Sequence, residues 1–210
     1  MQWRRQVTWD TRSRHWRTAA LFMVGSFCFA IGALPAYGAR VDGRVVGVTF
    51  VVGSIFFTSA ALSQVREVWA GGRTLDRWAV AVQLFGTVMF NFSTADALIE
   101  SLDAAEIDRL VWAPDIFGSI AFLVASHCAW LAVCGRFWRA LTDNDEWWVA
   151  ALNYLGSVFF MASAIASLVL PTSGDVVNIV VVNAGTFLGA VCFFVGAYLL
   201  LPERGDHAVG

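Results

Sequence analysis

The amino-acid sequence predicts an all-α, polytopic membrane protein with six transmembrane helices in a compact bundle. Composition is the first reason: 58% of the 210 residues are hydrophobic and 14% are charged, whereas a soluble domain has about 25% charged residues. The charged residues also lie between long apolar runs, which lack the alternating pattern of a membrane β-strand. In addition, one short motif occurs once in each of six apolar runs.

Each run is long enough to cross a bilayer, whose hydrocarbon core of about 30 Å requires roughly 20 helical residues. The predicted spans, in chain order, are 18–38, 43–65, 78–100, 113–135, 147–170 and 176–200. They form one membrane domain, 18–201, between an N-terminal segment, 1–17, rich in Arg and Trp, and a short tail, 202–210.

The first span follows Arg14 and Arg17, as the apolar part of a signal peptide would, and small residues occur near its end. We expect an uncleaved helix, because the run has the length of a full span and carries the motif. The second span contains a pair of glycines, Gly43 and Gly47. The third starts at Trp78, whose indole ring suits the headgroup region.

The fourth span opens with Asp115 beside Pro114, and we expect this acid to complement the helix dipole in a first turn. The fifth follows the acidic segment 143–146, which resembles a calcium loop but lacks its glycine and its distant glutamate. Helix capping therefore explains that segment better. The sixth span contains Gly185 and Gly189, four residues apart.

The repeated motif is Gly, then Ser, Thr or Ala, two free positions, Phe, two more free positions and two small residues. Positions i, i+4 and i+7 share one helix face, so the motif predicts a stripe on which helices approach closely around a Phe side chain. A role for its hydroxyls in contacting a ligand is the alternative. The Gly and Phe of the six copies are Gly25 and Phe29, Gly53 and Phe57, Gly86 and Phe90, Gly118 and Phe122, Gly156 and Phe160, and Gly189 and Phe193.

The six copies can be grouped as three helix pairs or as two helix triplets of opposite orientation, as in inverted-repeat transporters. The short first and fifth connections favour three antiparallel hairpins. All 14 basic residues are Arg, and only Arg40, Arg44 and Arg109 lie on the side opposite the termini. The positive-inside rule then predicts a bacterial inner-membrane protein with both termini in the cytoplasm.

Two stretches of the motif resemble a known family. They are Gly53-Ser54-Ile55-Phe56-Phe57 and Gly156-Ser157-Val158-Phe159-Phe160. Two-helix units with this pattern resemble the YrhK-like family of small bacterial membrane proteins, and the resemblance covers roughly residues 18–201. It implies a membrane-embedded helical protein. It implies no activity and no site residue, because the family has no established function.

A few polar residues fall within the predicted spans, where an ionisable side chain costs about 2.5–3.5 kcal/mol to insert. Asp96, Asn91 and Asn183 are expected in the outer half, as a cluster for a cation or proton; the alternative is that Asp96 only solvates a helix end. His127 is expected nearer the cytoplasm, as a proton relay or as a structural residue bonded to an amide such as Gln83 or Asn153. The spacing of these residues suggests no metal site.

No nucleophile–base pair or phosphate-binding loop occurs, so we expect no enzyme and no cofactor. The net charge of −2 argues against nucleic acid as a partner. Two functions fit a protein whose main surroundings are the lipid bilayer. It is a small transporter or channel for a proton, ion or small solute, or it is a non-catalytic scaffold that forms a homo-oligomer or binds a membrane partner protein through its glycine faces.

Overall fold

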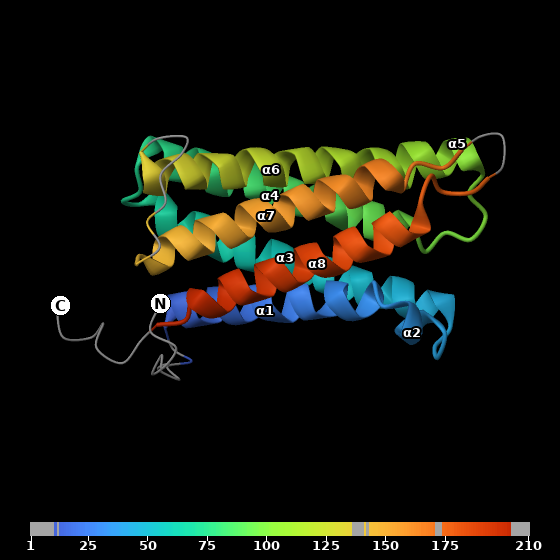
Figure 1. Cartoon of the computed structure of the whole chain (residues 1–210), viewed down its shortest axis with the longest axis horizontal. Helices are drawn as coiled ribbons and strands as arrows, with labels where there is room; N and C mark the ends of the chain where they lie inside the picture. Colours follow the sequence, from blue (N-terminus) through green and yellow to red (C-terminus); the bar gives the residue numbers. More distant parts are fainter. Residues whose placement is uncertain (1–10, 12, 136–140, 142, 171–173, 203–210) are drawn as a thin grey trace.

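The structure, a computed structural model, describes residues 11, 13–135, 141, 143–170 and 174–202. This part of the chain is helical and has no strand, apart from one isolated bridge between Val169 and Val176. Its six long helices, which run along the molecule in Figure 1, are α1 (Arg14–Gly32), α3 (Gly43–Trp69), α4 (Thr74–Asp96), α6 (Ala113–Cys134), α7 (Asp145–Ala166) and α8 (Ile179–Leu199). The short elements are α2 (Pro35–Gly38), α5 (Ala104–Ile107) and a π-helical turn, η1 (Asp108–Trp112).

Polar side chains start most of the long helices, as free N–H groups at a helix start require. Ser13 accepts a hydrogen bond from the Trp16 N–H at 3.5 Å, and Asp42 accepts one from Arg44 at 2.8 Å. Asn144 Oδ1 caps α7 by accepting a hydrogen bond from the Glu146 N–H at 2.8 Å. Asn178 caps α8 through the N–H groups of Val180 and Val181, both at 3.1 Å.

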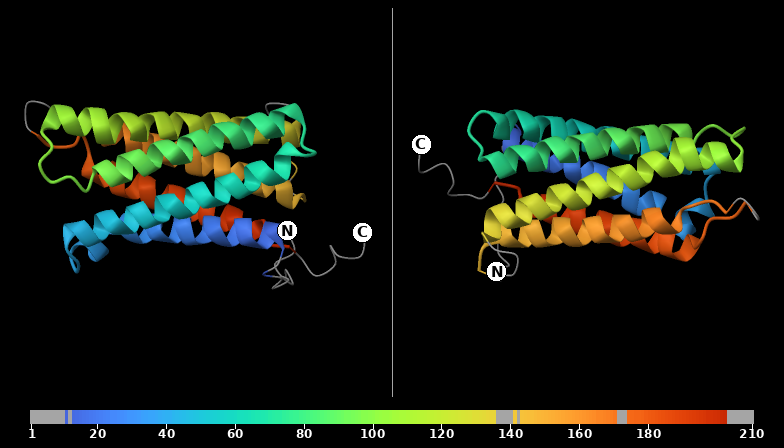
Figure 2. Two further views of the ribbon diagram at one scale, coloured as in Figure 1. Left: turned by 180° about the vertical axis from the view of Figure 1, so that it is seen from behind. Right: turned by 90° about the horizontal axis from the view of Figure 1, so that it is seen from above.

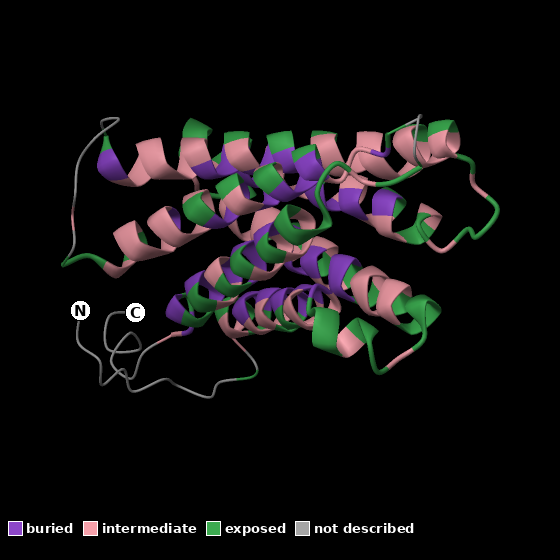
Figure 3. Cartoon of the chain, turned by 45° about the vertical axis from the view of Figure 1, so that its right-hand side comes forward, coloured by how far each residue is buried: buried purple, intermediate pink, exposed green. Residues whose placement is uncertain are grey.

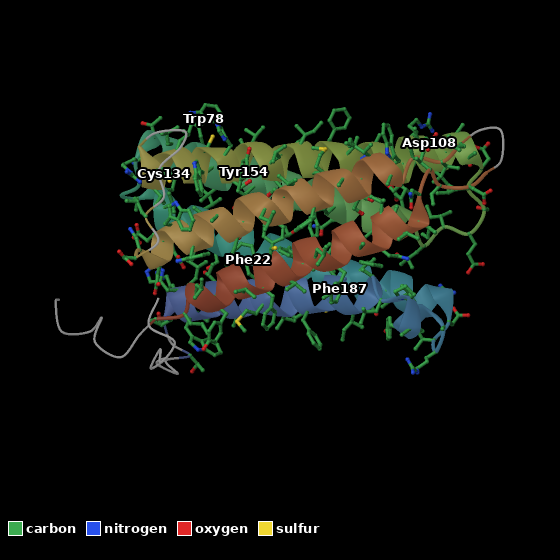
Figure 4. All side chains as sticks on the ribbon, in the orientation of Figure 1. Phe22, Trp78, Asp108, Cys134, Tyr154 and Phe187 are labelled. Carbon is green, nitrogen blue, oxygen red and sulfur yellow. The ribbon has the colours of Figure 1, made fainter. Side chains whose placement is uncertain are left out.

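The six long helices form a closed ring, in which each packs on its neighbours in sequence and α8 returns to α1. Neighbours run antiparallel (Figure 2), so α1 begins and α8 ends at one end of the bundle, which we call the terminal end. The helices α2 and α5 lie at the other end, the loop end. Trp78 and Cys134 mark the terminal end in Figure 4, and Asp108 marks the loop end.

Motif residues join the helices of the ring in three pairs: α1 with α3, α4 with α6 and α7 with α8. A Cβ atom added to Gly86 would lie 2.7 Å from the ring of Phe122, and one added to Gly118 would lie 2.9 Å from the ring of Phe90. Each glycine thus makes room for the Phe of its partner helix. The same exchange joins Gly25 and Gly53 to Phe57 and Phe29, and Gly156 and Gly189 to Phe193 and Phe160.

The six motif Phe side chains meet on the axis of the ring as two stacked triangles. Phe29, Phe90 and Phe160 form the outer triangle, with ring centroids 5.8–6.4 Å apart. The other three, Phe57, Phe122 and Phe193, form the inner triangle at 5.5–6.3 Å. All six are buried. The centre of the bundle is therefore filled by aromatic side chains, while many large apolar side chains are exposed. Figure 3 shows the exposed residues along the outside of the helices.

Contacts between two connections close the loop end. The Trp112 indole donates to the Ala164 carbonyl at 2.8 Å, and the Val169 N–H donates to Asp108 at 3.1 Å. The Ser167 hydroxyl lies 3.5 Å from a carboxylate oxygen of Asp115. These polar groups hold the α4–α6 connection against the α7–α8 connection.

The helices depart from the predicted spans in three places. The first run breaks after Gly32, because Pro35 favours an extended Leu34 (φ −77°, ψ 120°). Helix α4 covers Thr74–Asp96 rather than 78–100, because Asp76 accepts from the Arg73 N–H and starts the helix early. The fourth helical segment begins at Ala104 rather than at residue 113 and continues through α5 and η1 into α6, where Asp115 lies in the first turn, as expected.

Five helical segments of the described chain are long and apolar enough to cross a membrane, as expected of a multi-pass membrane protein. They are Gly43–Trp69, Thr74–Asp96, Ala104–Cys134, Asp145–Ala166 and Ile179–Leu199. The sixth long helix, α1, is not among them. Its first turn carries Arg14, His15 and Arg17, which lower its mean hydropathy. Most of the predicted segments 1–17 and 202–210 lies outside the described residues.

Candidate functional site

A cavity of about 980 Å³ enters the ring from the terminal end. Its mouth is formed by the first turns of α1, α4 and α7 and by the end of α8. It ends at Phe122 and Phe193 of the inner triangle. We call it the chamber. Its walls are mainly small apolar side chains from the inward faces of the helices: Val68, Ala79, Val80, Ala129, Val133, Val149 and Ala150.

Three carboxamides from three helices lie at the inner end of the chamber. Gln64 of α3, Gln83 of α4 and Asn153 of α7 surround a narrow hollow beside Phe22 and Phe193. We call this hollow the recess; Phe22 is labelled in Figure 4. The Oε1 atom of Gln64 is buried and has no hydrogen-bond partner among the described residues. A buried amide oxygen normally has one, because leaving it unpaired costs about 1–3 kcal/mol.

Gly196 of α8 lies directly against the Asn153 amide. A Cβ atom added at Gly196 would lie 3.1 Å from Asn153 Oδ1. The glycine therefore leaves room for the amide oxygen at this depth of the chamber. Asn153 also contributes its backbone carbonyl, which accepts the Ser157 hydroxyl at 2.8 Å.

The hydroxyls along the chamber are engaged in helix packing. Ser126 Oγ lies 3.0 Å from Ser157 Oγ, across the contact between α6 and α7. It also lies 2.7 Å from the Phe122 carbonyl of its own helix. Both serines are buried and line the chamber. Because these hydroxyls already have partners, they offer a ligand less than the three amides do.

Charged side chains lie only towards the mouth of the chamber in the described chain. The Arg73 guanidinium pairs with Asp76 at 2.9 Å, and this hydrogen bond and the carboxylate charge raise the pKa of Arg73. His15 lies 3.2 Å from Glu67, whose other oxygen is 3.0 Å from the Thr18 hydroxyl. Asp145 and Glu146 complete this rim. The chamber is therefore charged at its entrance and uncharged at its inner end.

The residues predicted to form a polar path lie in different parts of the ring. Asp96 is the last residue of α4, at the loop end, and is half-buried. Phe90 packs level with Gly118, which places Asp96 level with Trp112 and about 22 Å along the bundle from His127. The ring of His127 instead lies 5.9 Å from that of Tyr154. The four residues do not come together and none lines the chamber.

Asn91 and Asn183 are separated by the order of helices in the ring. Asn91 of α4 donates to the Thr58 hydroxyl of α3 at 2.9 Å. Its own Oδ1 is buried without a partner among the described residues. Asn183 belongs to α8, which packs on α7 and α1, whereas α4 packs on α3 and α6. The two asparagines therefore lie on opposite sides of the ring.

The sequence reasoning missed Gln64 and treated Gln83 and Asn153 only as partners for His127. A usable signal is their position relative to the motif. Gln83 and Asn153 each lie three residues before a motif glycine, Gly86 and Gly156. A shared offset of this kind places residues at one depth in equivalent helices.

The chain matches no protein-family model, no curated protein and no solved structure. Within the described residues, no group of three or more His, Cys, Asp or Glu side chains could hold a metal ion.

Proposed function

We propose that this protein is an inner-membrane transporter that binds a small solute in the chamber and carries it across the bilayer. One observation supports this most directly: the chamber enters the ring of apolar helices and ends at three amides, of which Gln64 has a buried carbonyl oxygen with no partner among the described residues. Its volume of about 980 Å³ is at the upper end of ligand pockets, about 300–1,000 Å³. Polar side chains inside an apolar bundle cost free energy, so their presence in the recess favours a binding role.

In this proposal α1 is the sixth transmembrane helix. Its 19 residues give a length of about 28 Å, close to the thickness of the hydrocarbon core. It closes the ring between α3 and α8, and its outward side chains Val24 and Phe27 are exposed, as lipid-facing residues are. Arg14 and Arg17 then lie at the headgroups, where long basic side chains reach water.

The terminal end faces the cytoplasm in this proposal. Among the described residues, five arginines lie at the terminal end and three at the loop end, the excess that the positive-inside rule requires on the cytoplasmic side. The chamber then opens to the cytoplasm. The loop end, with Glu100, Asp103 and Glu106, faces the outside.

We infer that the ring is built from three repeated hairpins. Two features support this: the reciprocal exchange of Gly and Phe within three helix pairs, and the two Phe triangles, each with one ring from every pair. Contacts between pairs lack this exchange; between α3 and α4, for example, Ser54 lies 3.0 Å from Thr94. Such differences suit a protein whose hairpins move against one another during transport.

The Phe triangles favour a carrier over an open channel. Six buried rings with centroid distances of 5.1–6.4 Å between neighbours fill the axis beyond the chamber. A solute that crosses must therefore displace these rings, which requires a conformational change. The chamber and the Phe triangles together correspond to one state of an alternating-access cycle, open to one side and closed to the other.

A scaffold that associates through glycine faces is the less favoured function. The six motif glycines are buried between helices of the same chain. They are therefore not available on the outside for a second copy or a membrane partner. The resemblance to YrhK-like proteins bears on neither function, because it implies no activity.

Uptake of radiolabelled solutes into proteoliposomes tests transport, with neutral, cationic, anionic and zwitterionic solutes compared. Ala129→Trp places a large ring in the chamber and should reduce uptake at least tenfold. Ala184→Trp, on the exposed face of α8, is the matched control and should retain it. Asp96→Asn should also retain uptake, because Asp96 lies outside the chamber. No uptake of any solute by the native protein, or equal uptake with Ala129→Trp, would contradict the proposal.

A further inference from the structure

The recess has a polar side and an apolar side. Gln64, Gln83 and Asn153 contribute amides from α3, α4 and α7. The remaining lining side chains are apolar and come from α1 and α8: Phe22, Phe193, Ala197 and Leu200. No ionisable side chain lines the recess in the described part of the chain. With about 20 Å³ of space, the recess itself holds no more than about one water molecule. A larger ligand must lie at the inner end of the chamber, which the same three amides and two aromatic rings, Phe122 and Phe193, also line.

The motif explains how this asymmetry arises. The position three residues before the motif glycine is Phe22 in α1, Gln83 in α4 and Asn153 in α7. The position eleven residues after it is Gln64 in α3, Ala129 in α6 and Leu200 after α8. All six residues line the chamber or the recess. Equivalent positions therefore carry amides on some helices and apolar side chains on others.

The chemistry of the amides restricts the ligand. Each carboxamide has two N–H donors and one carbonyl acceptor and carries no charge. The buried Gln64 Oε1 has no donor among the described residues, and a ligand with an N–H or O–H group can supply one. A charged ligand would leave its charge unpaired at this depth, because the ionic groups lie only near the mouth.

We propose that the inner end of the chamber, beside the recess, binds an uncharged, flat solute through an N–H/C=O amide edge, as found in lactams and nucleobases. The amide edge pairs with the carboxamides, and the flat body lies against Phe122 and Phe193. This inference names the ligand class of the proposed transporter and rests on the chamber being its ligand site. A flexible polyol fits less well, since it lacks a face for the aromatic rings.

Calorimetric titration of the full chain in mild detergent tests the ligand class. The probes are uracil for the flat amide, glycerol for polyols, glycine for zwitterions and choline for cations. Uracil should bind most tightly. Asn153→Leu and Gln64→Met should each weaken uracil binding about tenfold or more, which is the effect of one lost hydrogen bond of about 1.4 kcal/mol.

Asn183→Leu is the matched control, because it makes the same change at an asparagine outside the chamber. It should leave uracil binding unchanged. If Asn153→Leu does not assemble, judged by gel filtration and melting temperature, Gln64→Met still decides, since it keeps the side-chain length. Absence of uracil binding, tighter binding of another probe, or equal uracil affinity in the recess variants would overturn the inference.

The same probes separate this inference from the transport proposal. Uracil binding without uptake would support the ligand class and contradict transport. Uptake of a charged solute that Ala129→Trp blocks would support transport and contradict the ligand class. Neither uptake nor binding of any probe would contradict both.

Discussion

Gly86 illustrates what the motif does at the scale of single residues. Its Cα lies so close to α6 that an added Cβ would meet the Phe122 ring at 2.7 Å and the Gly118 carbonyl at 3.0 Å. Both helices need this closeness, because without water between them they associate through packing rather than through the hydrophobic effect. The hydroxyls that follow the motif glycines in α3, α4 and α7 bond to backbone carbonyls at 2.8–2.9 Å, which fits a packing role.

Gly86→Ala should therefore destabilise the bundle by about 1–3 kcal/mol, because a rigid backbone carbonyl and a packed ring resist the added methyl group. Gly43→Ala, at the exposed start of α3, is the control. Nothing lies within 4 Å of its added Cβ, so stability should be unchanged or rise by up to about 1 kcal/mol. Thermal unfolding in detergent measures both. Equal melting temperatures for the two variants would show that close approach at Gly86 is unimportant.

At the scale of elements, the three contacts that join one helix pair to the next differ in their side-chain hydrogen bonds. Ser54 of α3 lies 3.0 Å from Thr94 of α4, and Ser126 of α6 lies 3.0 Å from Ser157 of α7. In both contacts, the residue one position after the motif glycine of one helix lies against the residue eight positions after the motif glycine of the other helix. At the α8–α1 contact the equivalent of the second pair is Ala197 and Ser26. Ser26 Oγ is buried without a partner among the described residues. The α8–α1 contact therefore lacks the hydroxyl–hydroxyl hydrogen bond of the other two contacts.

Ala197→Ser should supply the missing partner for Ser26. Hydrogen bonds between membrane helices contribute about 0.6 kcal/mol on average, so a gain of that size in unfolding free energy is expected. Ala184→Ser, on the exposed side of α8, should give no gain. Unfolding in mixed micelles measures the difference. If Ser26→Ala removes the gain from Ala197→Ser, the two hydroxyls are the cause; if the gain persists, they are not.

The closed ring makes a prediction at the scale of the whole molecule. If α1 and the other five long helices all cross the membrane, Thr11 and Gly71 lie on the cytoplasmic side and Ala39 and Ser101 lie outside. Single cysteines at Ala39 and Ser101 should then react with an impermeant thiol reagent in intact cells. Cysteines at Thr11 and Gly71 should react only after permeabilisation.

The native cysteines, Cys28, Cys128, Cys134 and Cys192, are half-buried or buried within helices, so the unaltered protein is the control and should not react. If the cysteine at Thr11 reacts in intact cells and the cysteine at Gly71 does not, α1 does not cross the membrane. Reaction at Gly71 but not at Ser101 would reverse the proposed orientation.

The sequence alone determined the helical class and the approximate positions of the long helices, because hydropathy, length and capping are local properties of the chain. The spacing of Gly25 and Phe29 also indicated close helix packing, since a helix brings residues four apart onto one face. Helix ends were predicted less accurately. Asp96 was expected inside a span, yet a polar cap at Arg73 and Asp76 starts α4 earlier, and the helix ends at Asp96.

Only the tertiary structure decided which helices are neighbours and which side chains meet on the axis. Gln64 and Asn153 lie on α3 and α7, far apart in the chain, and they share one recess because the ring closes and each helix turns a particular face inward. For the same reason Asn91 and Asn183, both expected in the outer half of the membrane, lie on opposite sides of the ring. Helix order and rotation depend on packing between distant segments, which no local pattern specifies.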